Sequence, residues 1–157
     1  MISASGRAAG FFAALRMTVA GVGLLIGLFV HAAEPEMRLS PKKVRDEVRT
    51  VVEAQLAALQ AGDFATAYDF AARGIKRQFD ARLFAAMIRR GYGALLKPDR
   101  TDLGVVRDDG EGTAQVSVIA TDRQKRSTIY RYWLVKEDDV WRISGVMLEQ
   151  RPPRGDI

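Results

Sequence analysis

The stretch STIYRYWLVKEDDVWRISGVMLE, residues 127–149, decides the fold of this chain. Its two halves are rich in aromatic and β-branched residues, which favour strands, and Asp138-Asp139 separates them as a short turn. A two-residue loop pairs Glu137 with Val140, so the numbers of paired residues sum to 277. The stretch therefore predicts an antiparallel hairpin with a defined register.

This register sorts the side chains of the hairpin onto two faces. One face is apolar or aromatic throughout, with Gly145 opposite the Tyr132 ring, and we expect it to lie in the core. The other face is mixed, yet it carries more apolar side chains than a solvated face normally shows. With Val135, its apolar side chains predict a homodimer interface, and coverage by the chain's own terminal segments is the alternative. The candidate interface residues are Ile129, Trp133, Val146 and Leu148.

The residues upstream of the hairpin change from a helical period to a strand period near residue 100. Residues 113–120 alternate apolar and polar side chains, and Asp109-Gly110 ahead of them predicts a tight turn. Before them, apolar residues recur at three- and four-residue spacing in the segments 41–61, 64–72 and 81–90. The sequence therefore predicts an α+β domain, in which three N-terminal helices pack on one face of a curved four-stranded antiparallel sheet.

The predicted helices have recognisable boundaries. Ser40-Pro41 is typical of a helix start, with serine as the N-cap and proline in the first turn. Gly62 is expected to end the first helix, and Gly74 is expected to break the second. Asp63 and Asp80 are placed to cap the second and third helices.

The first 33 residues differ from the rest of the chain. They contain Arg7 and Arg16 but no acidic residue, and the apolar run of residues 17–30 ends at small residues. This order is typical of a Sec-type secretory signal, cleaved after Ala32 or Ala33, and it predicts export, most simply to the periplasm. The run falls short of the roughly 20 apolar residues of a spanning helix, but a retained anchor is the alternative.

The domain limits follow from these boundaries. We expect a signal at 1–32, a linker at 33–39, one domain at 40–150 and a mobile tail at 151–157. The only histidine, His31, would leave with the signal, and the chain contains no cysteine. The mature chain could then use neither a histidine-activated nor a cysteine nucleophile, and it could not bind zinc through histidine or cysteine. We therefore expect neither a metal nor another cofactor.

Several of these segments together resemble a known superfamily. The segments GDFATAYDFA (62–71), FAAMIRRGYG (84–93) and VWRISGVMLE (140–149) resemble the nuclear transport factor 2-like, or cystatin-like, superfamily. Over residues 44–149 the chain is most similar to the bacterial domain-of-unknown-function family numbered 4864. The resemblance implies a cone-shaped α+β fold, but it carries over no catalytic residue.

The tyrosines are the candidate pocket residues if the cone is open. A hydroxyl donor beside a buried carboxylate is the arrangement that a ketosteroid-isomerase-type reaction needs. The acid nearest to an aromatic helix face is Asp69, but it adjoins Tyr68 and points about 100° away in a helix. The alternatives are core tyrosines or a non-catalytic pocket for a small apolar ligand, formed by Tyr68, Tyr92, Tyr130 and Tyr132.

Charge adds one further candidate surface. The formal net charge is +5, but 19 acidic residues are mixed in, and no nucleic-acid partner is expected. The segment 73–90 holds six basic residues and Asp80 as its only acid. It predicts either contact with an anionic partner or a solvated helix face.

These observations favour an exported, non-enzymatic domain that binds a small ligand or a protein partner. A small isomerase or lyase with a tyrosine–carboxylate pocket is the alternative within the same fold. A membrane-tethered accessory protein is the third interpretation, and it requires that the segment 1–32 is retained.

Overall fold

The computed structural model describes residues 36–149. The predicted signal 1–32, its cleavage site and the predicted tail 151–157 lie outside the described residues. The elements follow in the order β1 (Arg38–Leu39), α1 (Lys42–Gln60), α2 (Phe64–Asp69), α3 (Arg73–Gln78), α4 (Ala81–Gly91), a 3₁₀ turn η1 (Gly93–Leu95), β2 (Arg100–Leu103), β3 (Arg107–Asp108), β4 (Thr113–Thr121), β5 (Ser127–Glu137) and β6 (Val140–Leu148).

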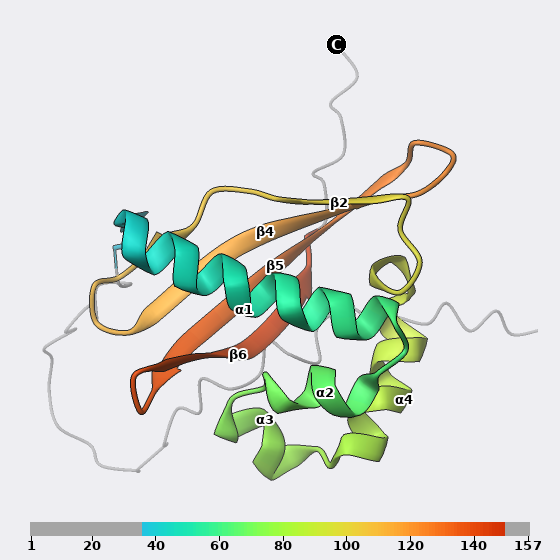
Figure 1. Ribbon diagram of the computed structural model, residues 1–157, viewed down its shortest axis with the longest axis horizontal. Coiled ribbons are helices and arrows are strands. Elements are labelled where there is room, and N and C mark those ends of the chain that lie inside the picture. Colours follow the sequence, from blue (N-terminus) through green and yellow to red (C-terminus); the bar gives the residue numbers. More distant parts are fainter. Residues whose placement is uncertain (1–35, 150–157) are drawn as a thin grey trace, which may run out of the picture.

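The predicted α+β architecture is confirmed, with helices on one face of a curved antiparallel sheet (Figure 1). α1 crosses that face of the sheet, and the shorter helices α2, α3 and α4 gather near its C-terminal end (Figure 1). Apolar side chains of α1 and of the sheet share one buried cluster, because each element must cover its apolar face. Its centre includes Val52, Leu59, Val118, Tyr132 and Leu134.

The number of elements differs from the prediction: residues 36–149 hold four α-helices and six strands rather than three and four. The predicted helix 64–72 ends at Asp69, and α3 begins at Arg73 and contains Gly74. The break lies between them, where the Ala72 N–H donates to the carbonyl of Ile143 (2.8 Å) and the Ile143 N–H to that of Phe70 (2.8 Å). Hydrogen bonds to β6 therefore interrupt the helix, and Gly74 does not.

The additional strands are short and lie at one side of β4. β2 and β3 both pair antiparallel with β4 along the same edge, and the two-residue β1 pairs with β3. Strands of two to four residues leave almost no periodic signal in a sequence. Their positions are decided by the long β4 that they pair with.

Both aspartate caps are confirmed. The Asp63 carboxylate accepts from the Thr66 N–H (3.0 Å), and the Asp80 carboxylate accepts from the Leu83 N–H (2.8 Å). The predicted serine cap of α1 is wrong, because Pro41 occupies the N-cap position and no side chain caps this helix. Ser40 is buried, and its N–H donates to the Val106 carbonyl in a bond that ties the chain to the sheet edge (3.2 Å).

The register of the β5–β6 hairpin follows the prediction only near its turn. Asp138 and Asp139 both have positive φ (48° and 62°), as a tight two-residue hairpin turn requires. Pairing runs as predicted from Glu137–Val140 to Leu134–Ile143, but Trp133 then pairs with Gly145. Ser144 is thus an extra residue in β6, and such a bulge bends a strand and shifts its later register by one.

Because of this bulge, two residues that were predicted to lie on the outer face do not lie there. Val146 pairs with Tyr132 and is 6% exposed, so the prediction of Val146 as an interface residue is wrong. Leu148 pairs with Tyr130 rather than with Ile129, and therefore leaves the predicted face as well, although it stays exposed. The physical reason is that the bulge moves Val146 into the core, and burial of a valine side chain contributes about 1.5–3 kcal/mol.

Candidate functional site

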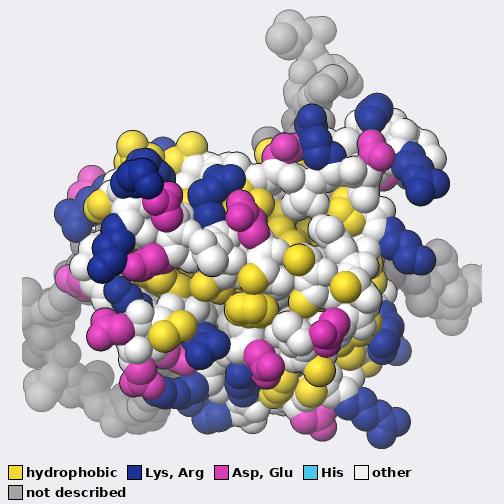
Figure 2. All heavy atoms as spheres, in the orientation of Figure 1, with side chains coloured by type: hydrophobic (Ala, Val, Ile, Leu, Met, Phe, Trp, Pro, Cys, Tyr) yellow, Lys and Arg dark blue, Asp and Glu magenta, His cyan; other side chains and the backbone are white. Residues whose placement is uncertain are grey.

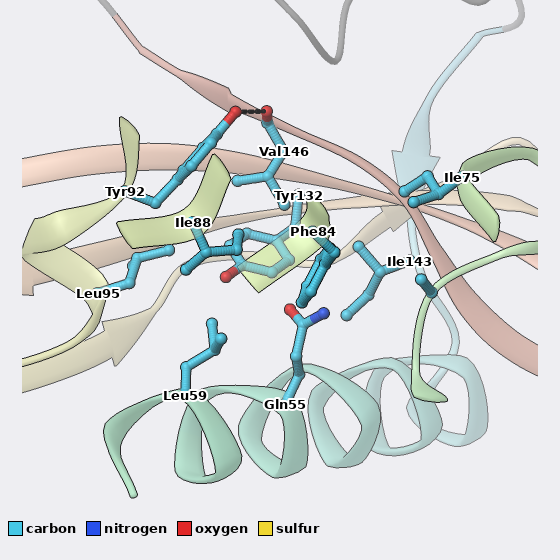
Figure 3. A pocket seen from close by; sticks show the side chains of 11 residues that line it. Gln55, Leu59, Ile75, Phe84, Ile88, Tyr92, Leu95, Tyr132, Ile143 and Val146 are labelled. Carbon is cyan, nitrogen blue, oxygen red and sulfur yellow. Dashed lines mark hydrogen bonds between the residues drawn. The ribbon is translucent and has the colours of Figure 1, made fainter. Parts of the chain in front are cut away.

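Two regions are candidates for the functional site: the interior between the helices and the sheet, where the tyrosines lie, and the face of the sheet turned away from α1. The structure brings Tyr92, Tyr130 and Tyr132 together, and separates Tyr68 from them. The rings of Tyr92 and Tyr130 have centroids 5.7 Å apart, and Tyr92 and Tyr132 line one small cavity (Figure 3). Tyr68 packs against Phe84 at 5.4 Å and does not line this cavity.

The phenols of this group are poor acids. The Tyr92 hydroxyl donates to the Val146 carbonyl at 3.0 Å, and burial, aided by the nearby Tyr130, raises the pKa of Tyr92 to about 12. Burial also raises the pKa of Tyr130 and, with the added influence of both neighbouring tyrosines, that of Tyr132. All three are therefore neutral hydroxyls near pH 7, able to donate a hydrogen bond but not to act as a base.

The cavity itself is very small. Its volume is about 10 Å³, close to the space of one water molecule, whereas small-molecule sites have roughly 300–1,000 Å³. No carboxylate lines it, and Asp69 is exposed at the end of α2. The interior therefore lacks the carboxylate partner that the tyrosine–carboxylate reaction would need.

Gln55 is a polar residue of this cavity that the sequence reasoning missed. It is buried in α1, and its side-chain amide donates to the Ala67 carbonyl at 3.2 Å, which joins α1 to α2 (Figure 3). A signal was available, since Gln55 falls within the apolar stripe of Val48, Val52 and Leu59. A polar side chain inside such a stripe needs a buried partner.

The two cavity tyrosines should respond differently to loss of their hydroxyls. We expect Tyr92→Phe to lower the free energy of unfolding by about 1–2 kcal/mol, because it removes a hydrogen bond and leaves the buried Val146 carbonyl without it. Tyr132→Phe removes no hydrogen bond to the described protein residues, and we expect a loss below about 0.5 kcal/mol. Urea unfolding of the two variants measures the difference, and equal losses would contradict this assignment.

The face of the sheet turned away from α1, called the outer face here, carries half-buried apolar side chains. Along β4 and β5 every second residue is buried, and the alternate residues point to the outer face. Arg131 on this face forms an ion pair with Glu149, and the Arg142 guanidinium donates to the Asp69 carbonyl at 3.0 Å. The apolar members are Ile119, Ile129, Trp133, Val135 and Met147.

A second hollow lies between α1 and β2 and has a volume of about 500 Å³. Its charged side chains all have partners: Arg49 lies 3.5 Å from Glu53, Arg100 lies 2.8 Å from Asp102, and Asp99 pairs with Lys125 at 3.0 Å. Figure 2 shows acidic and basic side chains intermingled over the face that carries α1. The hollow therefore presents no excess charge and no buried polar anchor to a ligand.

Residues 36–149 contain no group of three or more His, Cys, Asp or Glu side chains that could hold a metal ion. Within the same residues, no helix combines the length and the apolar character needed to cross a membrane.

Comparisons with known proteins extend this picture. The solved 1.8 Å structure of Aln2 from a Streptomyces species is similar to this chain, with a TM-score of 0.52 and 18% identity. The similarity covers 72% of this chain and 94% of the Aln2 chain, and at this identity it shows the fold alone. It supports the α+β fold that the sequence predicts, with helices packed on a curved antiparallel sheet. No curated protein matches the chain.

The family model named Domain of unknown function (DUF4864) matches residues 41–155, which is nearly the whole chain outside the first 40 residues. Because this match spans the helices and the sheet alike, the chain belongs to the DUF4864 family.

Proposed function

We propose that this protein is an exported, non-enzymatic interaction domain that forms a homodimer through the outer face of its sheet. The observation that carries the proposal is the group of half-buried apolar side chains around Trp133 on that face. The interior supports it as well, because a cavity of about 10 Å³ leaves little room for a substrate.

The outer face has the composition of an interface. Trp133 and Val135 are neighbours on this face of β5, and Arg131, which pairs with Glu149, separates them from Ile129. Arg142 adds a second basic side chain, opposite Val135 on β6. Specific interfaces combine an apolar centre rich in aromatic residues with a polar rim. A second copy is a suitable partner, because a twofold axis would bring the same patch from both copies together.

Replacing Trp133 with glutamate tests this interface. A charge at the centre of an apolar contact would be buried without a partner, so we expect the dimer to dissociate to monomers. Size-exclusion chromatography with light scattering should then report half the mass of the wild-type assembly.

Leu83→Glu is the matched control, because Leu83 is 50% exposed in α4, which lies on the helical side of the sheet rather than on the outer face. This variant should remain dimeric and fold as the wild type does, as judged by circular dichroism. A monomeric wild type, or a Trp133→Glu variant with unchanged mass, contradicts the proposed interface.

A small-ligand-binding role is the second candidate, and the Tyr132 hydroxyl favours it. This hydroxyl is buried, has no hydrogen bond to the described residues, and belongs to the wall of the interior cavity. A guest with a polar atom would find a donor there once the cone expands. Native mass spectrometry of protein purified from its own host detects such a guest, and it reports oligomer size and N-terminal cleavage in the same measurement.

A further inference from the structure

The solvent-facing side of α4 carries three arginines on one surface. Arg82, Arg89 and Arg90 surround Ala86 at spacings of three and four residues, which places their side chains on a common helix face. Leu83 lies beside them at 50% exposure, among the most exposed large apolar side chains of residues 36–149. We call this set, Arg82, Leu83, Ala86, Arg89 and Arg90, the arginine face.

These arginines are not neutralised by the described protein. No carboxylate of residues 36–149 forms an ion pair with them, whereas Arg73, Arg100, Arg126 and Arg131 all have such partners. Asp80, the nearest acid in sequence, is used to cap α4 at the Leu83 N–H. The Arg89 guanidinium lies 4.2 Å above the Phe64 ring, which holds this cation against the surface.

Helix stability does not explain the arrangement. Arg89 and Arg90 lie in the last turn of α4, where cations are favourable, but Arg82 lies in the first turn, where the helix dipole opposes a positive charge. No acidic residue within that first turn compensates for Arg82. α3, immediately before α4, adds Lys76 and Arg77 in its last turn. Basic side chains protrude along the right-hand margin of Figure 2, where α4 lies in Figure 1.

We propose that the arginine face of α4 binds the surface of an anionic phospholipid bilayer. The guanidinium groups would contact lipid phosphates, which they match by charge and by paired donors. Leu83 would enter the interface between headgroups and acyl chains, where an exposed apolar side chain beside basic residues is favourable. This contact is independent of dimerisation and does not require that residues 1–32 are retained as an anchor.

The composition of the arginine face favours a membrane over a soluble anion. Its three arginines are exposed, and none lines the interior cavity or the hollow between α1 and β2. A soluble polyanion would gain nothing from Leu83, whereas a bilayer offers it an apolar environment.

Vesicle sedimentation with the full chain tests the proposal. Binding to vesicles of phosphatidylcholine alone measures the contribution of other segments, including the apolar run 17–30. Binding to vesicles that also contain phosphatidylglycerol measures the added effect of a negatively charged surface. We expect the charge-dependent part of the partition coefficient to fall about fivefold for each arginine removed, hence about 25-fold in Arg82→Gln/Arg90→Gln. Raised salt should reduce the wild-type binding in the same direction.

Two further variants separate the alternatives. Arg123→Gln/Lys125→Gln removes the same charge from the exposed β4–β5 turn, and its binding should stay close to that of the wild type. Leu83→Ser keeps every charge, and it should weaken vesicle binding severalfold while leaving binding to soluble polyphosphate unchanged. The proposal is overturned if the double arginine variant binds vesicles as the wild type does, or if Leu83→Ser has no effect on vesicle binding.

Discussion

Replacing Leu134 with alanine should lower the free energy of unfolding by about 2–5 kcal/mol. Leu134 has no exposed surface and lies in the middle of β5, next to the register shift at Trp133. Its removal takes away buried apolar area and leaves a cavity that close neighbours in a packed sheet cannot fill. Urea unfolding followed by circular dichroism measures the loss.

The matched control is the same substitution at an exposed leucine of the paired strand. Leu148 is 44% exposed near the end of β6, so Leu148→Ala should change stability by less than about 1 kcal/mol. Similar losses at both positions would contradict the assignment of Leu134 to the buried face of the sheet.

The protein should lose stability steeply as the pH rises from 10 to 12. The pKa of Tyr92 is raised from 10.0 to about 12 in the folded state, so the unfolded chain releases this proton first. The contribution of the neutral Tyr92 phenol to the free energy of unfolding is therefore fully present below pH 10. It is lost as the pH rises toward 12, by up to about 1 kcal/mol per pH unit. Tyr130 and Tyr132, whose pKa values are also raised, act in the same direction.

Urea midpoints measured across this range, together with phenolate absorbance, test the expectation. Ionisation of the buried tyrosines should accompany loss of the folded circular dichroism signal, because the folded state holds their pKa values above those of the unfolded chain. Tyr92→Phe should show a shallower dependence on pH, although it starts from a lower stability. Gradual ionisation of every tyrosine near pH 10, with the fold intact, would contradict the burial of this group.

The predicted elements that the structure confirms rest on local signals. Asp63 and Asp80 cap helices because a short carboxylate side chain reaches the free N–H groups of the first turn. Asp138-Asp139 defines the hairpin because a two-residue loop leaves one pairing for the residues beside it. Each of these depends on neighbours within a few positions, which are visible in the chain.

The parts of the candidate site that escaped prediction depend on distant contacts. The amide of Gln55 finds its partner at Ala67, and the break between α2 and α3 depends on bonds to Ile143 of β6. The arginines of α4 were visible as a basic segment, but only the structure shows that they have no ion pair within residues 36–149 and that Asp80 caps α4 instead.

The sequence by itself determined the fold class, the family and the faces of the hairpin next to its turn, because periodicity, caps and turns act locally. Only the tertiary structure decided that Ser144 forms a bulge, that Val146 belongs to the core, and that the interior cavity has a volume of only about 10 Å³. The position of the bulge could not be predicted because forming a bulge costs little free energy in the residues around it. Its position is set by the packing gained across the whole sheet, which no short stretch of sequence contains.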